Sequence, residues 1–154
     1  MENDVTKQKV SVLKNLGIYQ LIGGVVGLLF IAWGIKDLIE SNVLVLLLFV
    51  VMALLFGYSV FCGVMCLRRH GKALTFSMVN QLLQVIGFVS GGYGFSYTAG
   101  IYFTFKFDLI EFPGLSFGLG VSRCNIDFNS GNEQAFMSVN IIAIWVFYEI
   151  LILV

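Results

Sequence analysis

Four long apolar segments, separated by short polar stretches, dominate the pattern of this chain. A helix needs about 20 apolar residues to cross the hydrocarbon core of a bilayer, and each segment is long enough. The pattern therefore predicts transmembrane helices over residues 16–35, 43–67, 73–94 and 135–154. We interpret residues 1–154 as one integral membrane domain, an all-α membrane protein with four transmembrane helices.

The third apolar segment carries amides and glycines at helical spacing. Asn80, Gln84, Gly87, Gly91 and Gly94 recur at alternating steps of four and three residues. On a helix this spacing places them on one face. Glycines let two helix backbones approach closely, and amides can bond across the crossing. We expect this face to pack against another helix rather than against lipid.

The first and third segments share the pattern Q-x-I-G-x-V-x-G, over residues 20–27 and 84–91. With four spans these two segments run parallel, so the chain would consist of two helical hairpins in a 2+2 tandem repeat. Common ancestry and convergence both remain open as explanations. Either way we expect the two polar faces to form one helix seam, and its predicted members are Gln20, Gly23, Gly27, Asn80, Gln84, Gly87 and Gly91.

The stretch between the third and fourth segments has a different period. Within residues 101–128, apolar and polar residues alternate on both sides of Pro113-Gly114. Period two around such a turn predicts an amphipathic β-hairpin. Because open strand edges cannot face hydrocarbon, we place this hairpin outside the membrane, on the extracytoplasmic side. The alternative is an irregular loop that lays phenylalanines on the membrane surface.

Composition and charge agree with a membrane protein. Hydrophobic residues make up 58% of the chain and charged residues 12%, against about 45–50% and about 25% in soluble domains. The net charge of zero gives no reason to expect nucleic acid as a partner. One side of the four-span topology holds most of the basic residues, which predicts a multi-pass protein with both termini cytoplasmic. These residues are Lys7, Lys9, Lys14, Arg68, Arg69 and Lys72.

Candidate chemistry is sparse. Cys62 and Cys66 lack the further ligands that a zinc site needs, so we expect no metal and no cofactor. Glu149 is the ionisable residue well inside a predicted span. A carboxylate there is either structural, reaching interfacial water or paired with Arg68 or Arg69, or a site for an ion or proton.

These patterns favour a non-enzymatic integral membrane subunit or sensor. It would assemble through its helix seams and its exposed hairpin, with the lipid bilayer, further copies of itself or another membrane protein as partners. The alternative is a small oligomeric channel or transporter, whose polar path would be lined by Gln20, Asn80, Gln84 and Glu149. We expect no enzymatic activity, because no catalytic constellation of side chains is recognisable.

Overall fold

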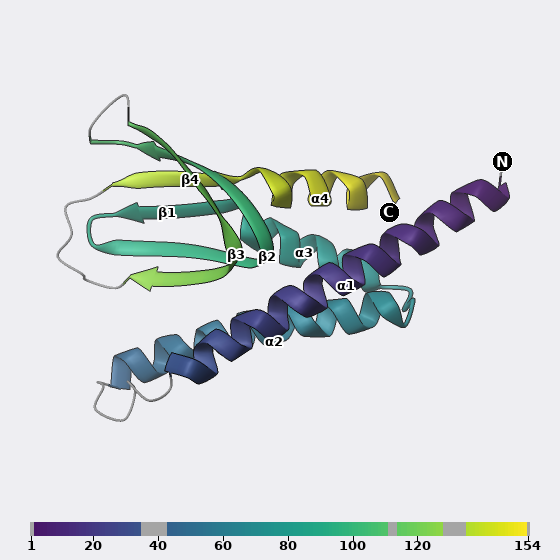
Figure 1. The fold of residues 1–154 in the computed structure, drawn as a ribbon, viewed down its shortest axis with the longest axis horizontal. Coiled ribbons are helices and arrows are strands. Elements are labelled where there is room, and N and C mark those ends of the chain that lie inside the picture. The colour runs from purple at the N-terminus through teal and green to yellow at the C-terminus, as the bar shows by residue number, and fades with distance from the viewer. Residues whose placement is uncertain (1, 35–42, 111–113, 128–134, 154) are drawn as a thin grey trace.

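The computed structural model describes residues 2–34, 43–110, 114–127 and 135–153. In these ranges the chain forms four helices and a four-stranded antiparallel sheet (Figure 1). The helices are α1 (Glu2–Gly34), α2 (Val43–Leu67), α3 (Ala73–Val85) and α4 (Ile141–Leu153). The strands are β1 (Ile86–Ser90), β2 (Tyr93–Asp108), β3 (Leu115–Asp127) and β4 (Phe136–Asn140).

Helices α1 and α2 pack against each other as an antiparallel pair (Figure 1). Two stretches, Lys9–Gly34 and Val43–Leu67, are long and apolar enough to cross a membrane. Small residues allow the close approach. A Cβ added at Gly63 would lie 2.7 Å from the backbone nitrogen of Leu21, so a larger side chain there would push the helices apart.

The prediction of four transmembrane helices is wrong. The third segment, predicted as a helix over residues 73–94, leaves the helical conformation after Val85 and continues as β1. The fourth, predicted over residues 135–154, begins with strand β4 before α4 starts. The architecture is therefore mixed helix and sheet rather than an all-α four-helix bundle.

Local sequence explains why the third segment changes conformation. Residues 86–90 alternate between exposed and buried positions, as a strand does. Gly91 and Gly92 follow with φ of 58° and 82°, the left-handed conformation favoured in tight hairpin turns. The turn reverses the chain into β2. In the resulting hairpin Ser90 lies opposite Tyr93, and Phe88 lies opposite Phe95.

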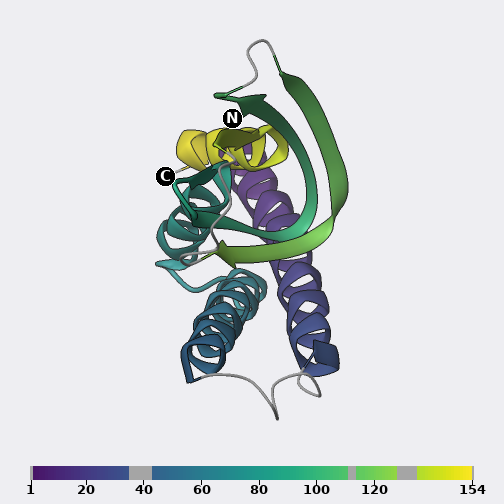
Figure 2. The ribbon, with the colours of Figure 1, turned by 90° about the vertical axis from the view of Figure 1, so that its left-hand side faces the viewer.

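The sheet curls because β2 is long and bent. Its first residues pair with β1, its last residues pair with β4, and β1 also pairs with β4. The β2–β3 register shifts between Thr98 and Ile101, near Gly100 with φ of 107° and Ser122 with φ of 45°. Both strands therefore bend, as Figure 2 shows.

Part of the predicted hairpin region exists in this sheet. Strands β2 and β3 are antiparallel, with Phe107 opposite Leu115. They belong to a four-stranded sheet, however, and β2 already begins at Tyr93, so they do not form an isolated hairpin over residues 101–128. Pro113 lies outside the described residues.

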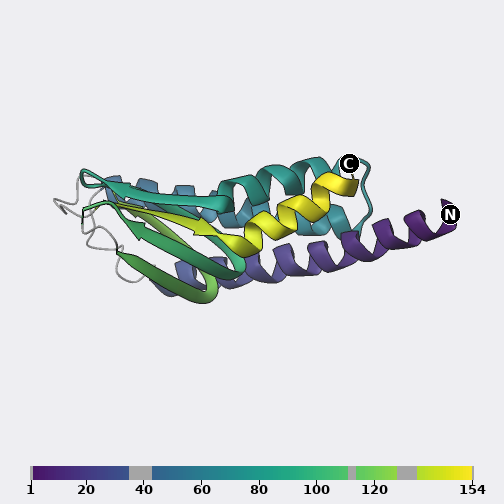
Figure 3. The same cartoon turned by 90° about the horizontal axis from the view of Figure 1, so that it is seen from above.

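The core is divided between the two ends of the molecule. At the helical end, Leu16 of α1, Cys66 of α2, Leu74 of α3 and Ile150 of α4 are buried together. At the sheet end, α2 packs on β2 in a second cluster of buried residues. Figure 3 shows α3 continuing into β1 and β4 continuing into α4. The sheet therefore lies beside one half of the α1–α2 pair, and α3 and α4 lie beside the other half.

Candidate functional site

A buried polar network joins three of the helices. The Ser77 hydroxyl donates to the Gln20 side-chain oxygen at 3.0 Å, which links α3 to α1. The Ser59 hydroxyl donates to the Gln20 carbonyl oxygen at 3.0 Å and accepts from the Asn80 amide at 3.2 Å. All four of these side chains have no solvent exposure. Each bond thus takes the place of a hydrogen bond to water, which a buried polar group has lost and which is costly to leave unreplaced.

The same network reaches the sheet through Gln84. Its side-chain oxygen accepts from the Ala99 backbone N–H at 2.9 Å, and its amide donates to the Asn80 carbonyl oxygen at 3.2 Å. The Tyr97 hydroxyl is 2.8 Å from the Leu55 carbonyl oxygen and 3.4 Å from Asn80 Oδ1. These bonds fix β2 against the helices.

Other buried amide atoms have no partner in the described part of the chain. They are Nε2 and Oε1 of Gln81, Nε2 of Gln20 and Nδ2 of Asn140. An unpaired buried polar atom costs about 1–3 kcal/mol. Gln81 thus lacks, among the described residues, the hydrogen-bond partners that Gln84 has on the same helix.

The structure places the residues of the predicted seam in several environments. Gln20 is linked to Asn80 through Ser59, and Asn80 is bonded to Gln84. Gly23 lies against the backbone of Gly100, and Gly27 lies against the ring of Phe56. The remaining two glycines are not helical. Gly87 lies in β1, and Gly91 lies in the turn, where an added Cβ would meet no atom within 4 Å. The expected single helix face at residues 80–94 is therefore wrong.

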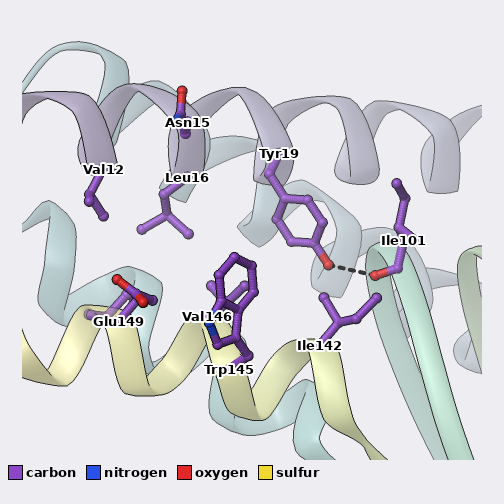
Figure 4. Close-up of a pocket in the computed structure, with 10 residues that line it drawn as sticks. Val12, Asn15, Leu16, Tyr19, Ile101, Ile142, Trp145, Val146 and Glu149 are labelled. Carbon is purple, nitrogen blue, oxygen red and sulfur yellow. Dashed lines mark hydrogen bonds between the residues drawn. The ribbon is translucent and has the colours of Figure 1, made fainter.

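A cavity of about 430 Å³ lies between α1, α4 and β2. Its lining is mostly apolar, as Figure 4 shows. We call it the α1–α4 cavity, and it is lined by Val12, Asn15, Leu16, Tyr19, Ile101, Ile142, Trp145, Val146, Glu149 and Ile150. Trp145 is 62% exposed and Ile101 is 53% exposed, so part of the cavity lining belongs to the surface of the molecule.

The polar groups of this cavity lie apart from one another (Figure 4). At one end the Tyr19 hydroxyl donates to the Ile101 carbonyl oxygen at 2.8 Å, so its proton is already used. Half-buried Glu149 lies toward the other end. No ion pair joins Glu149 to Arg68 or Arg69, although the structure describes all three residues. One of the roles considered for Glu149, pairing with Arg68 or Arg69, is therefore not seen among the described residues.

Sequence reasoning missed several of these residues. Ser59 and Ser77 join the amides, yet a serine in an apolar helix gives little signal on its own. Tyr19 and Trp145 resemble residues of a lipid-facing surface. Among the described residues, no group of three His, Cys, Asp or Glu side chains could hold a metal ion.

The chain matches no protein-family model, no curated protein and no solved structure.

Proposed function

We propose that this chain is a non-enzymatic, multi-pass membrane protein that binds an amphipathic molecule of the bilayer in the α1–α4 cavity. The observation that carries this proposal is a largely apolar cavity with one carboxylate, that of Glu149, toward one end. The volume of about 430 Å³ lies within the range of roughly 300–1,000 Å³ typical of small-molecule sites.

The position of Glu149 suggests how such a ligand would lie. Glu149 is one turn from Leu153, the last residue of α4. The Lys9 ammonium donates to the Leu153 carbonyl oxygen at 3.1 Å, so this end of α4 is polar. The ligand's head group would meet Glu149 near the membrane surface, and its chain would extend along Val146 and Ile142. A carboxylate favours an ammonium or another strong hydrogen-bond donor.

Binding accounts for the lining of the cavity better than catalysis does. General acid–base or nucleophilic chemistry needs a second group that is positioned to exchange a proton. The Tyr19 hydroxyl is held by a backbone carbonyl, and the Asn15 amide does not titrate. Glu149 is thus left as a binding group.

The polar residues of the alternative channel do not favour a path through this chain. Gln20 and Asn80 have no solvent exposure, and Gln84 is 2% exposed. Their polar atoms are mostly engaged in the network between helices and sheet. Oligomeric assembly, with copies of itself or with another membrane protein, stays a prediction.

We further propose that both termini are cytoplasmic. The two ends of the described chain and the turn between α2 and α3 lie at the same end of the molecule (Figure 1). Arg68, Arg69 and Lys72 belong to this turn, and Lys9 and Lys14 lie toward the same end of α1. Such clustering of basic residues is typical of the cytoplasmic side.

Energy transfer from Trp145 can test the ligand site. In a Trp33→Phe background Trp145 is the one remaining tryptophan, since the chain has two. The protein is placed in phosphatidylcholine nanodiscs and titrated with a dansyl-labelled long-chain amine. We expect saturable transfer that unlabelled amine competes away.

A matched pair of α4 variants makes the test specific. A charge-assisted hydrogen bond contributes about 1.5–3 kcal/mol, so Glu149→Gln should weaken binding by about tenfold or more. Tyr148→Phe is the control, because Tyr148 is 58% exposed and does not line the cavity. Transfer that rises linearly without saturation, or equal affinities of the two variants, would refute the proposal.

A further inference from the structure

The sheet has polar residues on its inner face and apolar residues on its outer face. Directly paired residues of neighbouring strands point to the same side of a sheet. By this criterion Ser96 and Asn125 share one face, and so do Lys106 and Ser138. These residues, with Thr98 and Arg123, line a cavity of about 20 Å³ within the curl. The charged ends of Lys106 and Arg123 therefore belong to the inner face.

The opposite face is apolar and uncovered over much of its area. In β3, Leu115, Phe117, Leu119 and Val121 are between 49% and 75% exposed. Ile101 of β2 is paired with Val121 and belongs to the same face. A sheet in water shows the reverse arrangement, with polar residues outward. The arrangement seen here is that of a sheet whose outer solvent is hydrocarbon.

The sheet lies at the level of the two apolar helices. The Tyr97 hydroxyl is 2.8 Å from the Leu55 carbonyl oxygen near the middle of α2. On the other helix, the Ser122 hydroxyl donates to the Gly23 carbonyl oxygen at 2.8 Å. If α1 and α2 cross a membrane, much of the sheet lies inside it.

The lengths of the helix–strand segments agree with this placement. Helix α3 and strand β1 have 13 and 5 residues. At about 1.5 Å per helical residue and about 3.3 Å per strand residue, they extend about 36 Å. Strand β4 and helix α4 have the same numbers of residues. Both segments are long enough for a hydrocarbon core of about 30 Å.

Strand pairing satisfies most of the backbone as hydrocarbon requires. Among the described strands, β1, β2 and β4 each pair on both edges, because β1 pairs with β2 as well as with β4. Strand β3 pairs along one edge with β2. The curl thus removes the open edges of three strands, and a location in the bilayer further requires that the free edge of β3 be covered, because open edges do not face hydrocarbon.

We propose that the curled sheet is embedded in the bilayer, with the outer face of β3 and the second half of β2 in contact with lipid acyl chains. Each of the segments α3–β1 and β4–α4 then crosses the membrane as a helix in one leaflet and a strand in the other. This placement rests on the membrane location of α1 and α2 in the proposed function, and it does not require a ligand in the α1–α4 cavity.

Tryptophan quenching can locate the outer face. Trp33 and Trp145 are 87% and 62% exposed, so replacing both with Phe gives a tryptophan-free background. Phe117→Trp then reports on the sheet, because Phe117 is 64% exposed and the change keeps an aromatic ring. Leu54→Trp on α2 is the matched helix position, 68% exposed. His70→Trp, in the exposed turn after α2, is the aqueous reference.

Each variant is reconstituted in vesicles of phosphatidylcholine brominated on the acyl chain and is titrated separately with iodide. We expect Phe117→Trp to behave like Leu54→Trp, with strong quenching by brominated lipid and at least fivefold less by iodide than His70→Trp. Leu119→Trp serves as a second reporter if Phe117→Trp does not fold.

Three outcomes would overturn the placement of the sheet. Iodide quenching equal to that of His70→Trp would put the sheet in water. Protection from both quenchers would mean that protein covers the outer face. Failure of brominated lipid to quench Leu54→Trp would remove the membrane location itself, and with it the proposed function.

Discussion

Two glutamines on α3 should respond in opposite ways to the same substitution. Gln81 and Gln84 are both buried, at 0% and 2% exposure. Gln84 bonds to the Ala99 N–H and to the Asn80 carbonyl, whereas neither side-chain polar atom of Gln81 has a partner in the described chain. Methionine has a similar length and no strong polar group. The pair thus separates the effect of hydrogen bonding from that of size.

The expected magnitudes follow from these contacts. Gln84→Met leaves the buried N–H of Ala99 without an acceptor, and such a group costs about 1–3 kcal/mol. Gln81→Met removes two unpaired polar atoms, so stability should be unchanged or higher by about 1 kcal/mol. Because about 1 kcal/mol shifts the Tm of a domain of this size by about 2–4 °C, the Tm values of the two variants should differ by at least about 2 °C.

Thermal unfolding in detergent, followed by circular dichroism, measures this difference. Reversibility is checked by a second scan, because the comparison needs equilibrium values. The reasoning fails if Gln81→Met lowers the Tm as much as Gln84→Met does. It also fails if Gln84→Met has the Tm of the parent protein, because the bond to β2 would then contribute nothing.

Two further pairs of variants test the packing of the sheet on the helices. Gly23→Ala should lower the Tm by several degrees, because its Cβ would meet the backbone of Gly100. Gly57→Ala is the control and should keep or raise the Tm, because its Cβ would meet nothing within 4 Å. Equal Tm values of the two variants would contradict the close contact. Tyr97→Phe removes a hydroxyl that bonds to α2 and α3, and it should lower the free energy of unfolding by about 1 kcal/mol. Tyr148→Phe, at an exposed position, is the control and should leave this free energy unchanged. A loss of stability in both variants or in neither would contradict this role of Tyr97.

Hydropathy predicted the first half of the chain well. Helix α2 has the bounds predicted for the second segment, Val43–Leu67. The predicted helix over residues 16–35 falls largely within α1, which starts earlier, at Glu2. In these segments the apolar run is long, and a helix satisfies its backbone by local hydrogen bonds, so no distant partner is needed to define it.

The other half depends on pairing between distant residues. Ile86 lies opposite Val139, and no local pattern joins segments so far apart in sequence. A stretch of five residues is also too short to show a period of two clearly. Gly87, Gly91 and Gly94 happen to fall at helical spacing, although the adjacent Gly91-Gly92 was a turn signal.

The candidate site was predictable only in part. Gln20, Asn80 and Gln84 were singled out as polar residues among apolar ones, and the structure brings them into one network. Ser59 and Ser77, which connect them, carry no such signal in the sequence. The α1–α4 cavity depends on the position of β2 beside α1 and α4, and no local pattern in the sequence indicates that position.

The unpaired edge of β3 limits how copies of this protein could associate through their sheets. Because β1, β2 and β4 are already paired on both sides, edge-to-edge contact through the described strands would have to join β3 of one molecule to β3 of another. A two-fold axis would then consume the free edge of both partners, and neither would have another to offer a third. Association by this route would stop at a dimer and would not propagate into a filament.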